Sequence, residues 1–214
     1  MSSSSTSFKP NVEFYSRQRM PVVGLGTWMS KDAAVDAALD MGYRQIHTAY
    51  NYRNEAAIGR VLKRWIDGEK VKREELFIVT MVRALVSHIQ KSPKALNLAY
   101  VGLYLVHTPV GLKNNGDDNI FPMDLDDTLQ IDPTTDLVSP WKGMEEQVGA
   151  GRAKSIGIGN FNKEQVTRIV KNARIKPANI QVELHAYFQQ KPLRELCEKH
   201  DITVVAYAPL GSPG

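Results

Sequence analysis

The residues most able to do chemistry lie around a tyrosine in the run YRQIHTAYNYRNE, residues 43–55. Tyr52 could act as a general acid, because its phenol can give a proton to an oxygen that gains negative charge. A phenol has an unperturbed pKa of about 10, so it donates slowly at neutral pH unless a cation stabilises the phenolate. His47 is the local candidate for that cation. The alternative is a neutral His47 hydrogen-bonded to Tyr52 or to backbone, because burial disfavours the charged ring.

Histidines also follow other predicted strands. His47, His107 and His185 fall near the carboxyl ends of alternate strands and could converge. No carboxylate with ligand spacing accompanies them, so we expect no metal site. A lone histidine at the end of a buried strand, such as His107, is usually satisfied structurally.

The elements that must position these residues alternate along the chain. The Ser-rich residues 1–10 are expected to be disordered, and residues 11–23 predict a short hairpin turning near Ser16 and Arg17 that could plug the base of a barrel. Strands are expected at 22–27, 43–49, 77–80, 101–107, 155–159, 179–184 and 203–208, and helices at 31–41, 54–67, 163–174, 191–200 and from a cap at Ser139. Gly42 and Gly68 are expected to end the first two helices.

Repeated β-α units imply parallel strands, so residues 11–214 predict one α/β domain of the TIM-type (β/α)₈ barrel class. Such barrels typically need about 250 residues, and we expect this one to be incomplete after about the seventh strand. The outer strands of an open barrel are a possible site of oligomerisation.

Two connections are unusual. Between Met81 and Tyr100, Pro93 falls inside the single plausible helix and leaves it little more than two turns. Residues 108–137 are rich in Gly, Asn, Asp and Pro without apolar periodicity, which suits a loop arching over a site.

Composition narrows the function classes. The chain has 214 residues, 43% of them hydrophobic, which is enough for one sizeable core. Its formal charge of +4 is modest, and the dense run EKVKREE at 69–75 mixes signs, so we expect no nucleic-acid partner. No signal peptide and no apolar run of the roughly 18 residues that span a membrane is present. With one cysteine, Cys197, these features predict a cytoplasmic protein without disulfides.

Several motifs, in this order, resemble the aldo-keto reductases: MPVVGLGTW (20–28), the run at 43–55, LYLVHTP (103–109), GRAKSIGIGNFN (151–162), QVELHAY (181–187) and VVAYAPLGSPG (204–214). The resemblance implies that NADPH gives a hydride to an aldehyde or ketone carbon while Tyr52 protonates the oxygen and His107 orients the carbonyl. NARIKPANIQVELH and IDPTTD resemble arthropod reductases of steroid-like or other lipophilic carbonyls.

The same resemblance exposes two replacements. In the family the tyrosine is helped by a Lys, which an Asp holds, and those positions read Met81 and His47. Met81 can neither ion-pair nor stabilise a phenolate. By analogy with loss of one oxyanion-hole donor, we expect turnover to fall by about 10² to 10³.

The cofactor residues are better kept. Asn160 and Gln181 match positions that hold the nicotinamide carboxamide, and Tyr207 matches the aromatic under the nicotinamide ring. Leu210 and Ser212 begin the pyrophosphate loop. The residues that grip the adenosine 2′-phosphate in the family would follow Gly214, so reduced NADPH affinity is expected.

Three functional hypotheses remain at this point. The first is an NADPH-dependent reductase of small carbonyl substrates, with weak or lost activity. The second is a catalytically inactive relative that binds a small ligand or a partner, which His47 and Met81 favour. The third is a shortened chain without a stable fold.

Overall fold

The computed structural model describes residues 10–30, 32–83, 91–116, 119 and 121–211. The predicted N-terminal hairpin is present: β1 (Asn11–Glu13) pairs antiparallel with β2 (Arg19–Pro21), and Arg17 takes a left-handed conformation in the turn. Of the tail at 1–10 that is expected to be disordered, residues 1–9 lie outside the described residues, as does Ser212.

A curled parallel sheet forms the centre of the molecule, and its seven strands lie side by side in chain order. They are β3 (Leu25–Gly26), β4 (Gln45–His47), β5 (Phe77–Val82), β6 (Val101–Val106), β7 (Ala153–Gly159), β8 (Asn179–Glu183) and β9 (Thr203–Tyr207). β3 and β9 are the outer strands of this half-barrel. The sequence expectation of an incomplete TIM-type barrel is confirmed for these strands.

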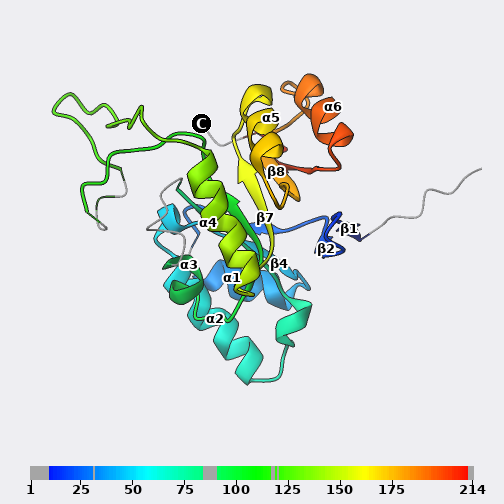
Figure 1. Ribbon diagram of the computed structural model, residues 1–214. Coiled ribbons are helices and arrows are strands. Elements are labelled where there is room, and N and C mark those ends of the chain that lie inside the picture. The colour runs from blue at the N-terminus through cyan, green and yellow to red at the C-terminus, as the bar shows by residue number, and fades with distance from the viewer. Residues whose placement is uncertain (1–9, 31, 84–90, 117–118, 120, 212–214) are drawn as a thin grey trace, which may run out of the picture.

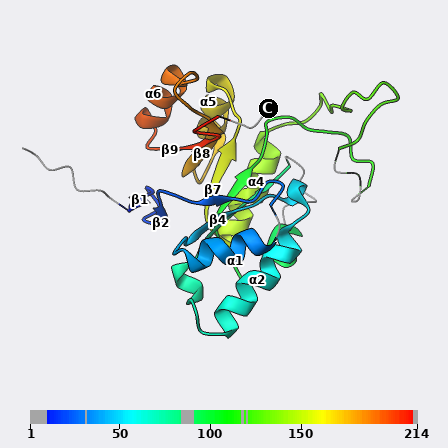
Figure 2. The ribbon, with the colours of Figure 1, turned by 180° about the vertical axis from the view of Figure 1, so that it is seen from behind.

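Helices cover the outer face of the sheet (Figures 1 and 2). They are α1 (Asp32–Asp40), α2 (Glu55–Asp67), α3 (Lys91–Ala95), α4 (Val138–Gly149), α5 (Lys163–Asn172) and α6 (Lys191–Lys199), with 3-10 turns η1 (Tyr50–Tyr52) and η2 (Arg73–Glu75). α1 ends just before Gly42, whose φ of 90° suits glycine, and α2 ends at Gly68 as predicted. Among the described residues, no helix is long and apolar enough to cross a bilayer.

Side chains from the two faces of the sheet belong to two separate apolar clusters. Outward side chains such as Ile78 and Tyr104 are buried under the helices. Inward side chains such as Val79 and Leu105 form a second cluster with Phe14 and Met20 of the hairpin. The hairpin therefore packs into the interior of the half-barrel, as expected for a plug, and Tyr15 fixes it by donating to the Lys176 carbonyl (2.5 Å).

Three details differ from the sequence expectations. The first strand covers Leu25–Gly26 and not 22–27. α4 begins at Val138, and Asp136 accepts the Val138 amide, so Ser139 is not the cap. The described residues between 108 and 137 extend away from the body of the molecule in Figure 1 and do not arch over it, and short bridges such as Leu112–Ile131 hold them. The third crossover helix is as short as Pro93 predicts.

Candidate active site

Tyr52 is held at the carboxyl ends of the strands by a hydrogen-bonded loop. Asn54, which follows η1, donates to the Thr27 carbonyl (2.8 Å) and accepts from the Thr48 hydroxyl (2.8 Å). The Thr27 hydroxyl in turn donates to the His47 carbonyl (2.9 Å). These bonds tie the ends of β3 and β4 to the turn that carries Tyr52, which is where barrels place reactive side chains.

Aromatic rings surround the Tyr52 phenol. Its ring meets Trp28 edge-on at 4.9 Å between centroids, His107 at 6.0 Å and His47 at 6.4 Å. The structure therefore brings together three of the predicted site residues. Trp28 was missed, although it closes the motif MPVVGLGTW, because an aromatic residue after a short strand carries no signal of its own.

Met81 brings no positive charge to the Tyr52 phenol. This side chain is 3% exposed and lies in the interior apolar cluster, against which Tyr52 also packs. Burial raises the pKa of Tyr52 above its usual value, and the nearby Tyr207 raises it further. The phenol is thus a weaker acid than free tyrosine, because of its burial and of Tyr207.

Both site histidines are neutral at neutral pH. Burial and the nearby His107 together lower the pKa of His47 to about 4, against the opposing effect of hydrogen bonds with backbone and with the Gln181 side chain. Burial alone lowers the pKa of His107 to about 4. The lowered pKa favours the neutral alternative for His47 over the imidazolium that would assist Tyr52.

Each of these rings keeps an unsatisfied atom. Nε2 of His47 and Nδ1 of His107 are buried and have no hydrogen-bond partner among the described residues. A buried polar atom without a partner costs about 1–3 kcal/mol, so both nitrogens are available to a ligand that reaches them.

The predicted nicotinamide residues lie at the ends of β7, β8 and β9. Asn160 adopts a left-handed conformation (φ 62°), and its amide donates to the His107 carbonyl (2.9 Å). The Tyr207 hydroxyl donates to Oδ1 of Asn160 (2.9 Å). Gln181 is 7% exposed, and its side chain interacts with His47. Asn160 and Tyr207 are thus adjacent, whereas Gln181 also belongs to the histidine cluster.

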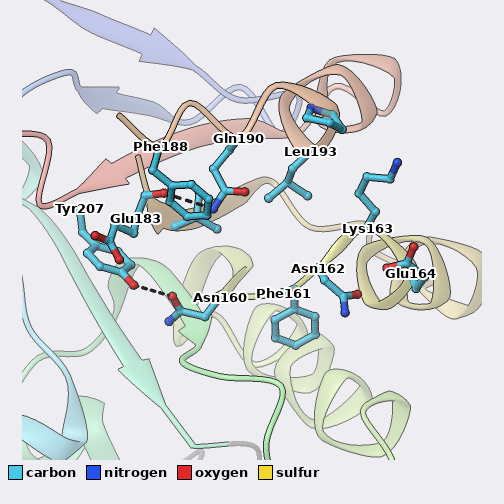
Figure 3. Close-up of a pocket in the computed structure, with 12 residues that line it drawn as sticks. Asn160, Phe161, Asn162, Lys163, Glu164, Glu183, Phe188, Gln190, Leu193 and Tyr207 are labelled. Atoms are coloured by element: carbon cyan, nitrogen blue, oxygen red, sulfur yellow. Dashed lines mark hydrogen bonds between the residues drawn. The ribbon is translucent and has the colours of Figure 1, made fainter. Parts of the chain in front are cut away.

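A cavity of about 460 Å³ opens beside Asn160 and Tyr207. Figure 3 shows their hydrogen bond at one end of it, and α5 and α6 contribute the other end through Lys163 and Leu193. Tyr52 does not line this cavity. The cavity lies next to the group of rings around Tyr52, because Asn160, which lines the cavity, bonds to the His107 carbonyl.

Other predicted residues are not part of this grouping. Leu210 is 99% exposed, and Ser212 lies outside the described residues. His185 is paired with Glu183, Nε2 to Oε1 at 3.2 Å. In the part of the chain that the structure describes, no three His, Cys, Asp or Glu side chains are grouped to hold a metal ion. The three histidines do not converge.

Comparison with known proteins agrees with this arrangement. The profile of the aldo/keto reductase family matches residues 23–214. The chain belongs to this family. It is 40% identical to aldo-keto reductase family 1 member A1 of Gallus gallus, over 94% of this chain and 64% of that protein. It is 39% identical to aldo-keto reductase family 4 member C11 of Arabidopsis thaliana, over 92% of this chain and 63% of that protein.

The fold has a similar match among solved structures. The aldose reductase of Schistosoma japonicum superposes with a TM-score of 0.88 at 42% identity, covering 95% of this chain and 70% of that one. This aldo/keto reductase chain spans about 64% of the length of the Gallus gallus relative. Family and fold are established on this basis.

Proposed function

We propose that this protein is an NADPH-dependent carbonyl reductase with strongly reduced turnover. The observation that carries the proposal is the convergence of Tyr52 and His107 beside the Asn160–Tyr207 pair, at the carboxyl ends of the strands. Family membership supports carbonyl reduction as the class of chemistry. Small aldehydes or ketones, including steroid-like ones, are the substrates we propose.

The cofactor residues present fit a nicotinamide. Tyr207 leaves a 39% exposed ring beside the cavity, and the neighbouring Asn160 amide offers both a donor and an acceptor. NADPH, when bound, would supply the hydride. Its proposed affinity is reduced, since Leu210 makes no enclosed contact at the start of the pyrophosphate loop.

In this proposal the side chains of the chain divide the remaining work. Tyr52 holds the proton at its hydroxyl and passes it to the carbonyl oxygen as that oxygen gains charge. His107, as a neutral imidazole, orients the same oxygen through its one N–H donor. The raised pKa of Tyr52 slows the proton transfer, which is the physical reason for the low turnover.

Restoring the two missing groups tests the proposal. The double variant His47→Asp with Met81→Lys should raise kcat by about 10²-fold, because a lysine cation would stabilise the Tyr52 phenolate. The measurement is transfer of deuterium from NADPH labelled at the nicotinamide C4 to the alcohol formed from an aromatic aldehyde. Adding Tyr52→Phe to the double variant should remove the gain.

Met41→Lys is the matched control, since Met41 is 81% exposed and the substitution adds the same charge away from the site. It should leave the rate unchanged. No deuterium transfer by either the native protein or the double variant, while each remains folded and binds NADPH, would overturn the proposal.

A second function is favoured by one specific observation. The ion pair expected for catalysis is replaced by a neutral histidine and a thioether, both buried. This set suits a ligand-binding relative without turnover.

Two further properties belong to the proposal. The protein is cytoplasmic, which fits the free Cys197. Copies of the chain associate through the outer strands β3 and β9 of the open sheet.

A further inference from the structure

The two replacements at the site change the kind of ligand that it can hold. His47 ends β4, Met81 lies on β5, and His107 directly follows β6, so the three residues sit on three successive strands of the sheet. An aspartate and a lysine at positions 47 and 81 would form an ion pair. The residues present offer an imidazole and a thioether, which carry lone pairs and no charge.

The register places these side chains on the same face. His47 is in register with Val79, and Met81 with Leu105. Val79, Met81 and Leu105 all lie in the interior cluster. Because side chains alternate along a strand, His107 shares the face of Leu105. The three side chains therefore line the inside of the half-barrel at its carboxyl end.

Independent observations place the two histidines close to each other and beside Tyr52. His107 acts electrostatically on His47, and both rings flank Tyr52. One ring nitrogen of each histidine is buried without a partner among the described residues.

We propose that His47, Met81 and His107 form a site for a soft monovalent cation of the copper(I) class. Thioethers select copper(I) among biological metals, and imidazole is a common copper ligand. The surroundings, which include Ala49 and Leu105, are apolar. An apolar site penalises a doubly charged ion more than a singly charged one, because the cost of desolvation rises steeply with charge. Tyr52 stands beside the site as a further oxygen donor.

The test is a titration of the purified full chain with copper(I) under anaerobic conditions, without NADPH or a carbonyl. A chromophoric copper(I) chelator competes for the metal. We expect one copper(I) per chain, and sulfur as well as nitrogen in the X-ray absorption spectrum of the bound metal. Because cofactor and substrate are absent, the outcome does not depend on the proposed reductase activity.

Matched variants locate the site. Met81→Leu preserves volume and should weaken binding at least about 10-fold with loss of the sulfur signal, since change of a metal's surroundings typically costs 10- to 100-fold. Met41→Leu, at an 81% exposed methionine, should change nothing. His47→Gln should weaken binding as Met81→Leu does, whereas His200→Gln and Cys197→Ala should not. Circular dichroism checks that each variant is folded.

Three results would overturn the proposal. One is folded protein that leaves all copper(I) with the chelator. Another is binding that Met81→Leu and His47→Gln leave intact, which would place the metal elsewhere in the chain. The third is zinc bound at least as tightly as copper(I) in the same competition, which would contradict the soft character of the site.

Discussion

Glu55 shows at the scale of one residue how burial sets a charge. This first residue of α2 is 3% exposed, and Thr80 donates to its Oε1 at 2.6 Å. Burial raises the pKa of Glu55 to about 7, although the hydrogen bond from Thr80 opposes the shift. The unfolded chain ionises this carboxyl near pH 4.5. The folded state is therefore penalised increasingly as the pH rises from about 4.5 to 7, and no further above that.

Glu55→Gln should remove this penalty. We expect the variant to gain on the order of 2–3 kcal/mol in unfolding free energy at pH 8 and little at pH 4, because the amide accepts from Thr80 without ionising. Urea unfolding across this pH range measures the difference between variant and native chain. The exposed Glu195→Gln is the control and should show no such trend. A constant difference at all pH values would contradict the raised pKa.

His47 and His107 act in the opposite direction. Their pKa values of about 4 lie below the unfolded value of 6.5, so the unfolded chain takes up protons first as the pH falls. Their contribution to stability is therefore lost between about pH 6.5 and 4. This effect cancels when Glu55→Gln and the native chain are compared at the same pH.

At the scale of elements, a glycine sets the distance between α2 and the segment that follows α3. A Cβ built on Gly59 would lie 2.5 Å from the backbone oxygen of Leu96, which is fully buried. Backbone cannot swing away as a flexible side chain can. The close approach of these two elements thus depends on the absence of a side chain at position 59.

Gly59→Ala should destabilise the fold by about 1–3 kcal/mol, even though alanine favours helix by about 1 kcal/mol. The matched control is Gly149→Ala at the end of α4, where an added Cβ meets nothing within 4 Å. It should be neutral or slightly stabilising. Urea midpoints compare the two variants, and equal stabilities would show that the contact at Leu96 is not restrictive.

Local signals explain which elements were predictable. Gly42 and Gly68 each lie beside a helix end, Gly42 with a positive φ that suits glycine and Gly68 as the C-cap residue of α2. At α4 the signal failed, because the helix begins at Val138, one residue before Ser139, and Asp136 accepts the Val138 amide. The family motifs located Tyr52 and His107. The neutral state of His47 and the pairing of Asn160 with Tyr207 depend on burial and on strand register, which one sequence does not reveal.

At the scale of the whole molecule, the N-terminal hairpin completes the interior core. Phe14 is 2% exposed and meets the Phe77 ring edge-on at 6.2 Å. Figure 1 shows the hairpin and the described part of segment 108–137 on opposite sides of the molecule. The hairpin thus fills part of the interior of the half-barrel, although it lies far in sequence from most of the strands that surround it.

Phe14→Ala should cost about 3–5 kcal/mol, as for other large buried aromatics. Val23→Ala, at a 59% exposed position nearby in the chain, should stay within about 0.5 kcal/mol. Thermal and urea unfolding measure both. A loss below about 1 kcal/mol for Phe14→Ala would mean that the hairpin is not part of the cooperative core.

The contact between Trp28 and Tyr52 gives the site an optical reporter. The chain has three tryptophans, of which Trp65 and Trp141 are 8% and 1% exposed, whereas Trp28 is 58% exposed. Indole emission depends on exposure to water and on neighbouring groups, so the long-wavelength part of the spectrum belongs to the indole beside Tyr52. Occupancy of the site and integrity of the core can therefore be followed separately in one unlabelled sample.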